Sequence, residues 1–188
     1  ARYLLQHPEL RPDGRLLARD IIEWVTRVFA TDSVTMGGVP EKGLQWGAEV
    51  LSEQVNDMDK MSSHTARYAS VRALWYEVTG DQDSRERAYR SFNWATYSSR
   101  ENGLVKTSLD EGTGYWFSDG YGDYMRHFQR GMASVPEWAP AGEDHLLGSS
   151  SVVRSIRYAE DELAYVTFDR CSREVLRLRY EPVSVKAG

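Results

Sequence analysis

The sequence predicts an α+β protein, in which antiparallel helical hairpins are followed by a small antiparallel β-meander. Over most of residues 1–140, apolar residues recur with the spacing of one helix face. Between Pro136 and Pro140 the period changes, and later segments alternate between apolar and polar residues, as half-buried strands do. We therefore expect a helical region over residues 1–140 and an antiparallel β region over residues 141–188.

Two helices are predicted in the first 80 residues. One follows Asp13 and Gly14, and the other follows Ser62 and Ser63, either of which can cap a helix N-terminus. The segment Thr79–Asp81 ends the second helix. The residues expected to face the core are Leu17, Ile21, Trp24, Val25 and Val28 in the first helix and Tyr68, Val71, Trp75 and Val78 in the second.

Two more helices are predicted before residue 140. A third begins at Asp83 or Ser84, and its short connection to the preceding helix favours an antiparallel hairpin. A fourth begins at Ser118 or Asp119, after a long turn-rich stretch. Their expected apolar faces are Ala88, Phe92 and Ala95 in the third and Phe117, Tyr121, Tyr124, Phe128 and Met132 in the fourth.

The last 40 residues have the composition and alternation of strands. Residues 151–158 and 163–168 form a predicted hairpin across the turn 159–162, and residues 176–180 alternate as a half-buried strand. The final apolar residues are typical of a strand cut short, so we expect a truncated β region and a chain that is a fragment of a longer one.

Composition and charge exclude several classes of function. The 188 residues are 41% hydrophobic and 27% charged, which is enough apolar residues to bury a core. The formal net charge of -5 argues against nucleic-acid binding, which requires a basic surface. No apolar run approaches the roughly 18 residues of a membrane-spanning helix. We expect neither a nucleic-acid partner nor a membrane partner.

The motifs of nucleotide-dependent and nucleophilic enzymes are missing from the sequence. There is no phosphate-binding loop of the Gly-x-x-x-x-Gly-Lys type and no Gly-x-Ser-x-Gly motif. The single cysteine, Cys171, excludes an internal disulfide and a multi-cysteine zinc site. On a helix, Asp119, Asp123 and His127 span two turns, too far for all three to bind one ion without distortion. We expect no cofactor and no metal.

The helical hairpin, with Tyr76 and Thr79–Asp81 at its turn, resembles one unit of an α/α toroid. The run Trp116–Tyr121, which leads into a helix and then an antiparallel sheet, extends this resemblance to the C-terminal part of the six-hairpin glycosidase-like superfamily. The resemblance covers residues 14–188 in layout. It implies part of a toroid, with the start of its sheet domain, in a protein that binds or cleaves poly- or oligosaccharides. It also implies export, which is common among polysaccharide-acting relatives.

The densest group of candidate site residues precedes and enters the fourth predicted helix. The four-residue spacing of Asp119, Asp123 and His127 places them in a line on one helix face, where a carboxylate could act as acid or base. Trp116 and Tyr121 could pack against sugar rings. In the alternative interpretation, Asp119 caps the helix and Asp123 pairs with a neighbouring base, Arg126 or His127, on a solvated face.

A second group surrounds the start of the second predicted helix. His64 or Tyr68 could abstract a proton while Arg67 neutralises a uronate carboxylate, as lyase chemistry requires, and Glu53 is another candidate acid or base. In the alternative, Tyr68 belongs to the core and His64 is a polar residue of the first turn.

These observations leave several functions open. The chain could belong to a glycoside hydrolase, which needs two carboxylates such as Glu53 with Asp119 or Asp123. It could also belong to a polysaccharide lyase, to a non-catalytic carbohydrate-binding module or to a helical scaffold. As a fragment, the chain could lack activity of its own. Apolar helix faces left uncovered in a partial toroid would favour homo-oligomers.

Overall fold

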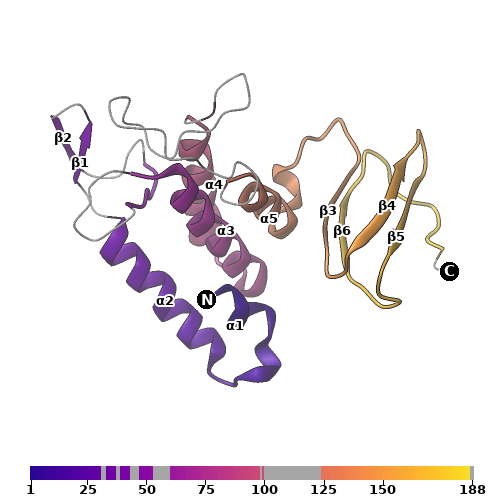
Figure 1. Cartoon of the computed structure of the whole chain (residues 1–188), viewed down its shortest axis with the longest axis horizontal. Coiled ribbons are helices and arrows are strands. Elements are labelled where there is room, and N and C mark those ends of the chain that lie inside the picture. Colours follow the sequence, from indigo (N-terminus) through magenta and orange to yellow (C-terminus); the bar gives the residue numbers. More distant parts are fainter. Residues whose placement is uncertain are drawn as a thin grey trace. The chain divides into compact units, whose positions relative to one another are not determined.

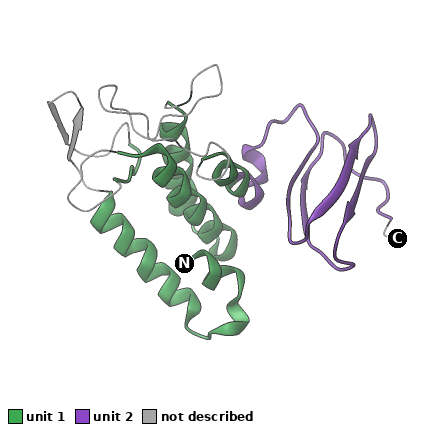
Figure 2. Cartoon of the chain, viewed as in Figure 1, with its two compact units in different colours: residues 1–131 green, residues 132–188 purple. Residues whose placement is uncertain are grey.

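The computed structural model describes residues 1–30, 33–36, 39–42, 47–52, 60–97, 99 and 124–186. The chain divides into two compact units, residues 1–131 (unit 1) and 132–188 (unit 2), coloured separately in Figure 2. The domain boundary predicted from the sequence follows residue 140, and it stays a prediction.

Unit 1 is mainly helical and unit 2 contains four of the strands (Figure 1). The elements in chain order are α1 (Arg2–Gln6), η1 (Pro8–Leu10), α2 (Gly14–Phe29), β1 (Ser33–Met36), β2 (Val39–Lys42), α3 (Ser62–Thr79), α4 (Gln82–Thr96), α5 (Arg126–Ser134), η3 (Pro136–Trp138), β3 (His145–Ser149), β4 (Val153–Tyr158), β5 (Leu163–Thr167) and β6 (Glu174–Arg177). Every strand pair in the described part of the chain is antiparallel, so the predicted α+β class is confirmed. Closure of the helices into part of a toroid stays a prediction.

Helix α2 buries Gly14, Ala18 and Ile22, which recur every four residues along one face. Leu5 and Leu74 join Ala18 in one apolar cluster. The prediction that Trp24 faces the core is wrong, because its side chain is 48% exposed. Trp24 follows Ile22 by two positions, which turns it about 200° around the helix axis, away from the buried face.

Helices α3 and α4 form the predicted antiparallel hairpin. Gly80, with φ of 77°, ends α3 in the left-handed conformation that glycine adopts without steric cost, and its N–H donates to Tyr76 O at 2.7 Å. Asp81 then caps α4 by accepting from the backbone N–H of Asp83. The predicted serine cap of α3 is wrong: Met61 occupies that position, and Ser62 lies within the first turn.

The first part of α5 packs closely on α4. A Cβ atom at Gly131 would lie 2.5 Å from the ring of Phe92, so only glycine permits this approach without displacing the ring. The rings of Phe92 and Phe128 contact each other with centroids 4.8 Å apart. The hydroxyl of buried Tyr124 donates to Ala95 O at 2.6 Å. These contacts fix the position of the residues at the start of α5.

In unit 2, the β4–β5 hairpin lies between β3 and β6 in the sequence, and β3 pairs with β6. The connectivity is therefore nested, one antiparallel pair inside the other, rather than a simple meander. The strands are half-buried or exposed along their whole lengths. By contrast, unit 1 buries polar side chains, among them His127 in the first part of α5.

Candidate functional site

Helix α3 contributes to two polar clusters in unit 1, each centred on a buried side chain. The Glu49 cluster consists of Glu49 with Thr26, Tyr68, Arg72, Ser84 and Arg87. The His127 cluster consists of His127 with Arg2, Arg67, Ser70, Arg126 and Arg130. The two clusters differ in how completely their polar groups are paired.

In the Glu49 cluster, one buried carboxylate meets two guanidinium groups. Glu49 is 4% exposed, and its Oε2 lies 3.3 Å from Nε of Arg72, which is also buried. Nη1 of Arg87 donates to Glu49 Oε1 at 2.6 Å. The Tyr68 hydroxyl donates to Glu49 Oε2 at 2.7 Å. Both carboxylate oxygens are therefore occupied.

The other groups of the Glu49 cluster are also paired. Arg72 donates through Nη1 to Ser84 and through Nη2 to Thr26, at 3.1 and 3.2 Å. Burial raises the pKa of Tyr68, and the Glu49 carboxylate adds to this, whereas Arg72 opposes it. A buried phenol that stays protonated and has its oxygen within hydrogen-bond distance of three groups is a poor proton acceptor. We interpret this cluster as structural.

The His127 cluster is built around a buried imidazole on α5. His127 is 1% exposed, and its Nδ1 lies 3.4 Å from Oγ of Ser70 on α3. Its Nε2 is buried and has no hydrogen-bond partner among the described residues. Buried polar atoms are almost always paired in folded proteins, so an unpaired ring nitrogen requires an explanation.

The surroundings of Ser70 determine which imidazole nitrogen carries the proton. Its single hydroxyl proton is donated to Arg67 O at 2.7 Å, and its oxygen accepts from Arg2 Nη2 at 3.0 Å. With its proton donated to Arg67 O, Ser70 Oγ accepts from His127, and we infer from this the tautomer that carries its proton on Nδ1. The unpaired Nε2 then carries a lone pair and is a hydrogen-bond acceptor.

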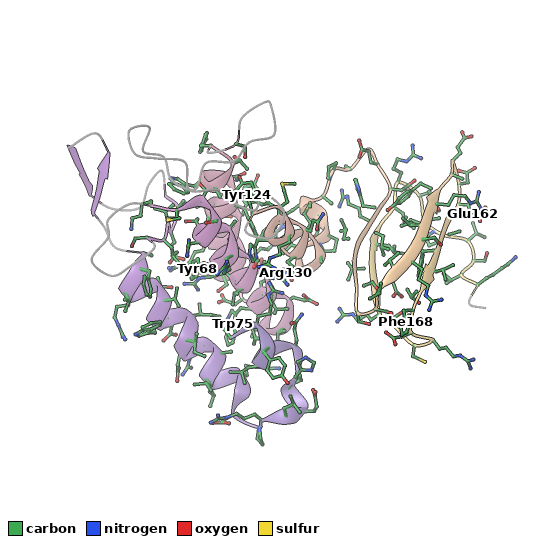
Figure 3. The ribbon with its side chains drawn as sticks, in the orientation of Figure 1. Tyr68, Trp75, Tyr124, Arg130, Glu162 and Phe168 are labelled. Carbon is green, nitrogen blue, oxygen red and sulfur yellow. The ribbon has the colours of Figure 1, made fainter. Side chains whose placement is uncertain are left out.

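Four arginines from three helices lie close enough to His127 to act on its charge: Arg2 on α1, Arg67 on α3, and Arg126 and Arg130 on α5. Figure 3 labels Arg130. Burial, and then repulsion from these four groups, lower the pKa of His127 to about 3. Burial and the charge of Arg130 also lower the pKa of Arg2 to about 10, which Glu77 partly opposes. His127 is therefore neutral at neutral pH.

A second polar atom of this cluster is unpaired. Nε of Arg126 is buried and has no hydrogen-bond partner within the described parts of the chain. In contrast to buried His127, Arg67 and Arg130 are exposed, so the cluster extends from the surface to a buried base. It thus places four guanidinium groups beside one donor and one acceptor that have no partner among the described residues, an arrangement suited to binding an anion with polar substituents.

The structure brings two of the predicted site residues together, Arg67 and His127. The alternative that places His127 on a solvated face is wrong, because its side chain is buried. Tyr68 belongs to the core, as its position in the apolar pattern predicted, and its hydroxyl serves the Glu49 cluster. His64 is half-buried in the first turn of α3, with Nδ1 3.3 Å from Ser63 Oγ.

The other candidates lie outside the described residues: Glu53, Trp116, Asp119, Tyr121 and Asp123. Their roles stay predictions. Four members of the His127 cluster were not predicted as site residues from the sequence: Arg2, Ser70, Arg126 and Arg130. The four-residue spacing of Arg126 and Arg130 could have indicated a basic helix face, whereas nothing in the sequence connects Arg2 with α5.

The residues that the structure describes contain neither a metal centre nor a membrane-spanning helix. Within them, no group of three or more His, Cys, Asp or Glu side chains is arranged to hold a metal ion. None of the helices among them is long and apolar enough to cross a membrane.

Comparison with known proteins adds no relative. No protein-family model matches the chain, and neither curated proteins nor solved structures give a significant match.

Proposed function

We propose that this chain is part of a carbohydrate-active α/α-toroid protein and that its His127 cluster binds an acidic oligo- or polysaccharide through a carboxylate. The observation that carries the proposal is the pair of unpaired buried atoms, His127 Nε2 and Arg126 Nε, beside four guanidinium groups. Guanidinium groups bind carboxylates through strong charge-assisted hydrogen bonds. That the carboxylate belongs to a saccharide is inferred from the resemblance to α/α toroids alone.

Two versions of this function remain, an enzyme and a binding module. Of the enzymes, a polysaccharide lyase fits the cluster better than a hydrolase does, because Arg67 and His127 supply a cation and a base. In that reaction, Nε2 takes the proton from the carbon that bears the carboxylate. The released electron pair forms a carbon–carbon double bond, and the bond to the leaving sugar oxygen breaks. That oxygen takes a proton from water, and His127 later loses its own proton to water.

The low pKa of His127 weakens it as a base, which favours the binding module. A substrate carboxylate among the arginines would raise this pKa, because an anion stabilises the protonated imidazole. The hydrolase version requires Glu53, Asp119 and Asp123 and stays a prediction.

The experiment compares an oligosaccharide of uronic acids with its methyl ester, which has the same sugars without the charge. We expect calorimetry to detect binding of the acid form only. Arg67→Gln should weaken it about tenfold or more, the effect of losing one charge-assisted hydrogen bond. Arg15→Gln, at an exposed position of α2, is the matched control and should leave binding unchanged.

The same samples separate the enzyme from the binding module. A lyase would generate the ultraviolet absorbance of an unsaturated uronide, a hydrolase would generate reducing ends without it, and a binding module would generate neither. Equal binding of the acid and its ester, or binding of neither, would contradict the proposal.

A further inference from the structure

We infer that the His127 cluster selects a carboxylate carried on a hydroxyl-bearing ring, with Arg126 binding the carboxylate and His127 Nε2 accepting a hydrogen bond from a ring hydroxyl. This inference rests on the proposed function and specifies its ligand. It follows from the opposite character of the two unpaired atoms, one a donor and one an acceptor.

The acceptor is His127 Nε2. Because Ser70 Oγ gives its proton to Arg67 O, the imidazole donates through Nδ1 and presents a lone pair at Nε2. The surrounding arginines keep this ring neutral by repelling a second proton. A ligand atom at Nε2 must therefore carry a hydrogen, as a hydroxyl group does and a carboxylate oxygen does not.

The donor is Arg126 Nε, which always carries a hydrogen. A ligand atom there must be an acceptor, and the positive charge of the cluster favours an anionic oxygen. Arg126 and His127 both lie on α5, and the charge of Arg126 acts on the imidazole. The inference therefore requires one ligand that spans the two side chains.

Simple anions satisfy only half of this site. Acetate or sulfate would pair with the arginines but would leave the Nε2 lone pair unpaired or facing an oxygen lone pair. Leaving a buried acceptor unpaired costs about as much as a lost hydrogen bond or more. A sugar acid supplies both groups, so the site should distinguish it from an anion of the same charge.

Ser70 is a positioning residue in this account, because it acts through His127. It holds the imidazole proton on Nδ1, and Arg2 in turn holds Ser70 by donating to its carbonyl and its hydroxyl oxygen at 2.8 and 3.0 Å. A Ser70→Ala chain would release Nδ1 from this constraint. Its Nε2 could then carry the proton, and the preference for a hydroxyl group would decline.

The test compares two ligands with six-membered rings that carry one carboxylate each, methyl glucuronide with hydroxyls and cyclohexanecarboxylate without. Isothermal titration calorimetry on the whole chain should give the glucuronide at least about tenfold higher affinity. Measured in two buffers of different ionisation enthalpy, its binding should take up no proton, because His127 stays neutral.

Two variants assign the preference to the ring nitrogen. His127→Phe keeps a ring without an acceptor and should reduce the affinity ratio to about one, mainly by weakening glucuronide binding. His7→Gln, at an exposed histidine paired with Glu9, is the control and should retain the wild-type ratio. The ratio in the wild-type chain remains decisive if His127→Phe fails to fold.

The outcomes separate this inference from the proposed function. Equal affinities for both ring acids, or uptake of one proton with the glucuronide, would overturn the inference and leave an acid-binding site. Binding of neither ring acid would refute the proposed function. In that case, a preference for glycolate over acetate would still support the donor–acceptor pair, and the absence of this preference would overturn it.

Discussion

The Glu49 and His127 clusters share helix α3 but differ in how completely their buried polar atoms are paired. In the first, the buried Glu49 carboxylate forms ion pairs with Arg72 and Arg87 and accepts a hydrogen bond from the Tyr68 hydroxyl. In the second, four arginines lie near a neutral imidazole, and two buried atoms have no partner among the described residues. A cluster whose buried polar atoms are paired stabilises the fold, whereas buried atoms without a protein partner carry a cost that a ligand can offset.

The largest effect is expected from removing the negative charge of the Glu49 cluster. Glu49→Gln leaves buried Arg72 without its counter-charge and should lower the free energy of unfolding by about 3 kcal/mol. Urea unfolding monitored by tryptophan fluorescence measures this. Glu86→Gln breaks an exposed pair with Arg90 and should cost no more than about 0.5 kcal/mol. Equal losses of unfolding free energy in the two variants would contradict the structural role of the Glu49 cluster.

The pH dependence of stability should reveal the His127 cluster. The pKa of His127 is about 3 in the folded chain, below the value of about 6.5 in an unfolded chain. Between these values the unfolded state binds a proton that the folded state does not. Stability should therefore fall as pH falls through this window, by at most about 1.4 kcal/mol per pH unit, and be independent of His127 above it.

Subtracting the same curve for His127→Phe isolates this contribution from that of the carboxylates. Urea unfolding between about pH 5 and about pH 7 covers the range where carboxylates contribute least. Parallel curves for the two chains would show that His127 is protonated normally when folded and would contradict the proposed role of the arginines.

The smallest expected change in the free energy of unfolding is an increase. Arg126→Met removes a charge whose Nε is buried and unpaired, so stability should rise by about 0.5 kcal/mol through reduced repulsion. Binding of the uronic-acid oligosaccharide should be lost at the same time. Thermal unfolding of both chains measures the first effect and calorimetry the second. A destabilisation as large as that of Glu49→Gln would mean that Arg126 has a structural role.

Local signals in the sequence predicted the elements of the fold well. Thr79–Asp81 marked the hairpin turn because Gly80 adopts the left-handed conformation there, and the 159–162 turn joined β4 to β5. The prediction for Trp24 failed because the apolar stripe of this helix is broad and includes Leu17, Ile21, Trp24 and Val28. Which side of the stripe is buried depends on the packing of Leu5 and Leu74 on Ala18.

The site was only partly predictable. Arg67 and His127 were candidates by residue type, but their meeting depends on α5 packing against the α3–α4 hairpin, a contact between distant segments. Arg2 and Ser70 are 68 residues apart and carry no motif, so their role in fixing the imidazole proton became visible only in the folded chain.

The most direct test of the central claim is nitrogen NMR of the His127 imidazole at neutral pH, with and without methyl glucuronide. The account predicts a protonated Nδ1 and an unprotonated Nε2 in the free chain. Adding the glucuronide should shift the Nε2 resonance as its lone pair accepts a hydrogen bond, without protonating it. A free imidazole protonated at Nε2, or at both nitrogens, would contradict the assignment of Nε2 as the acceptor of this site.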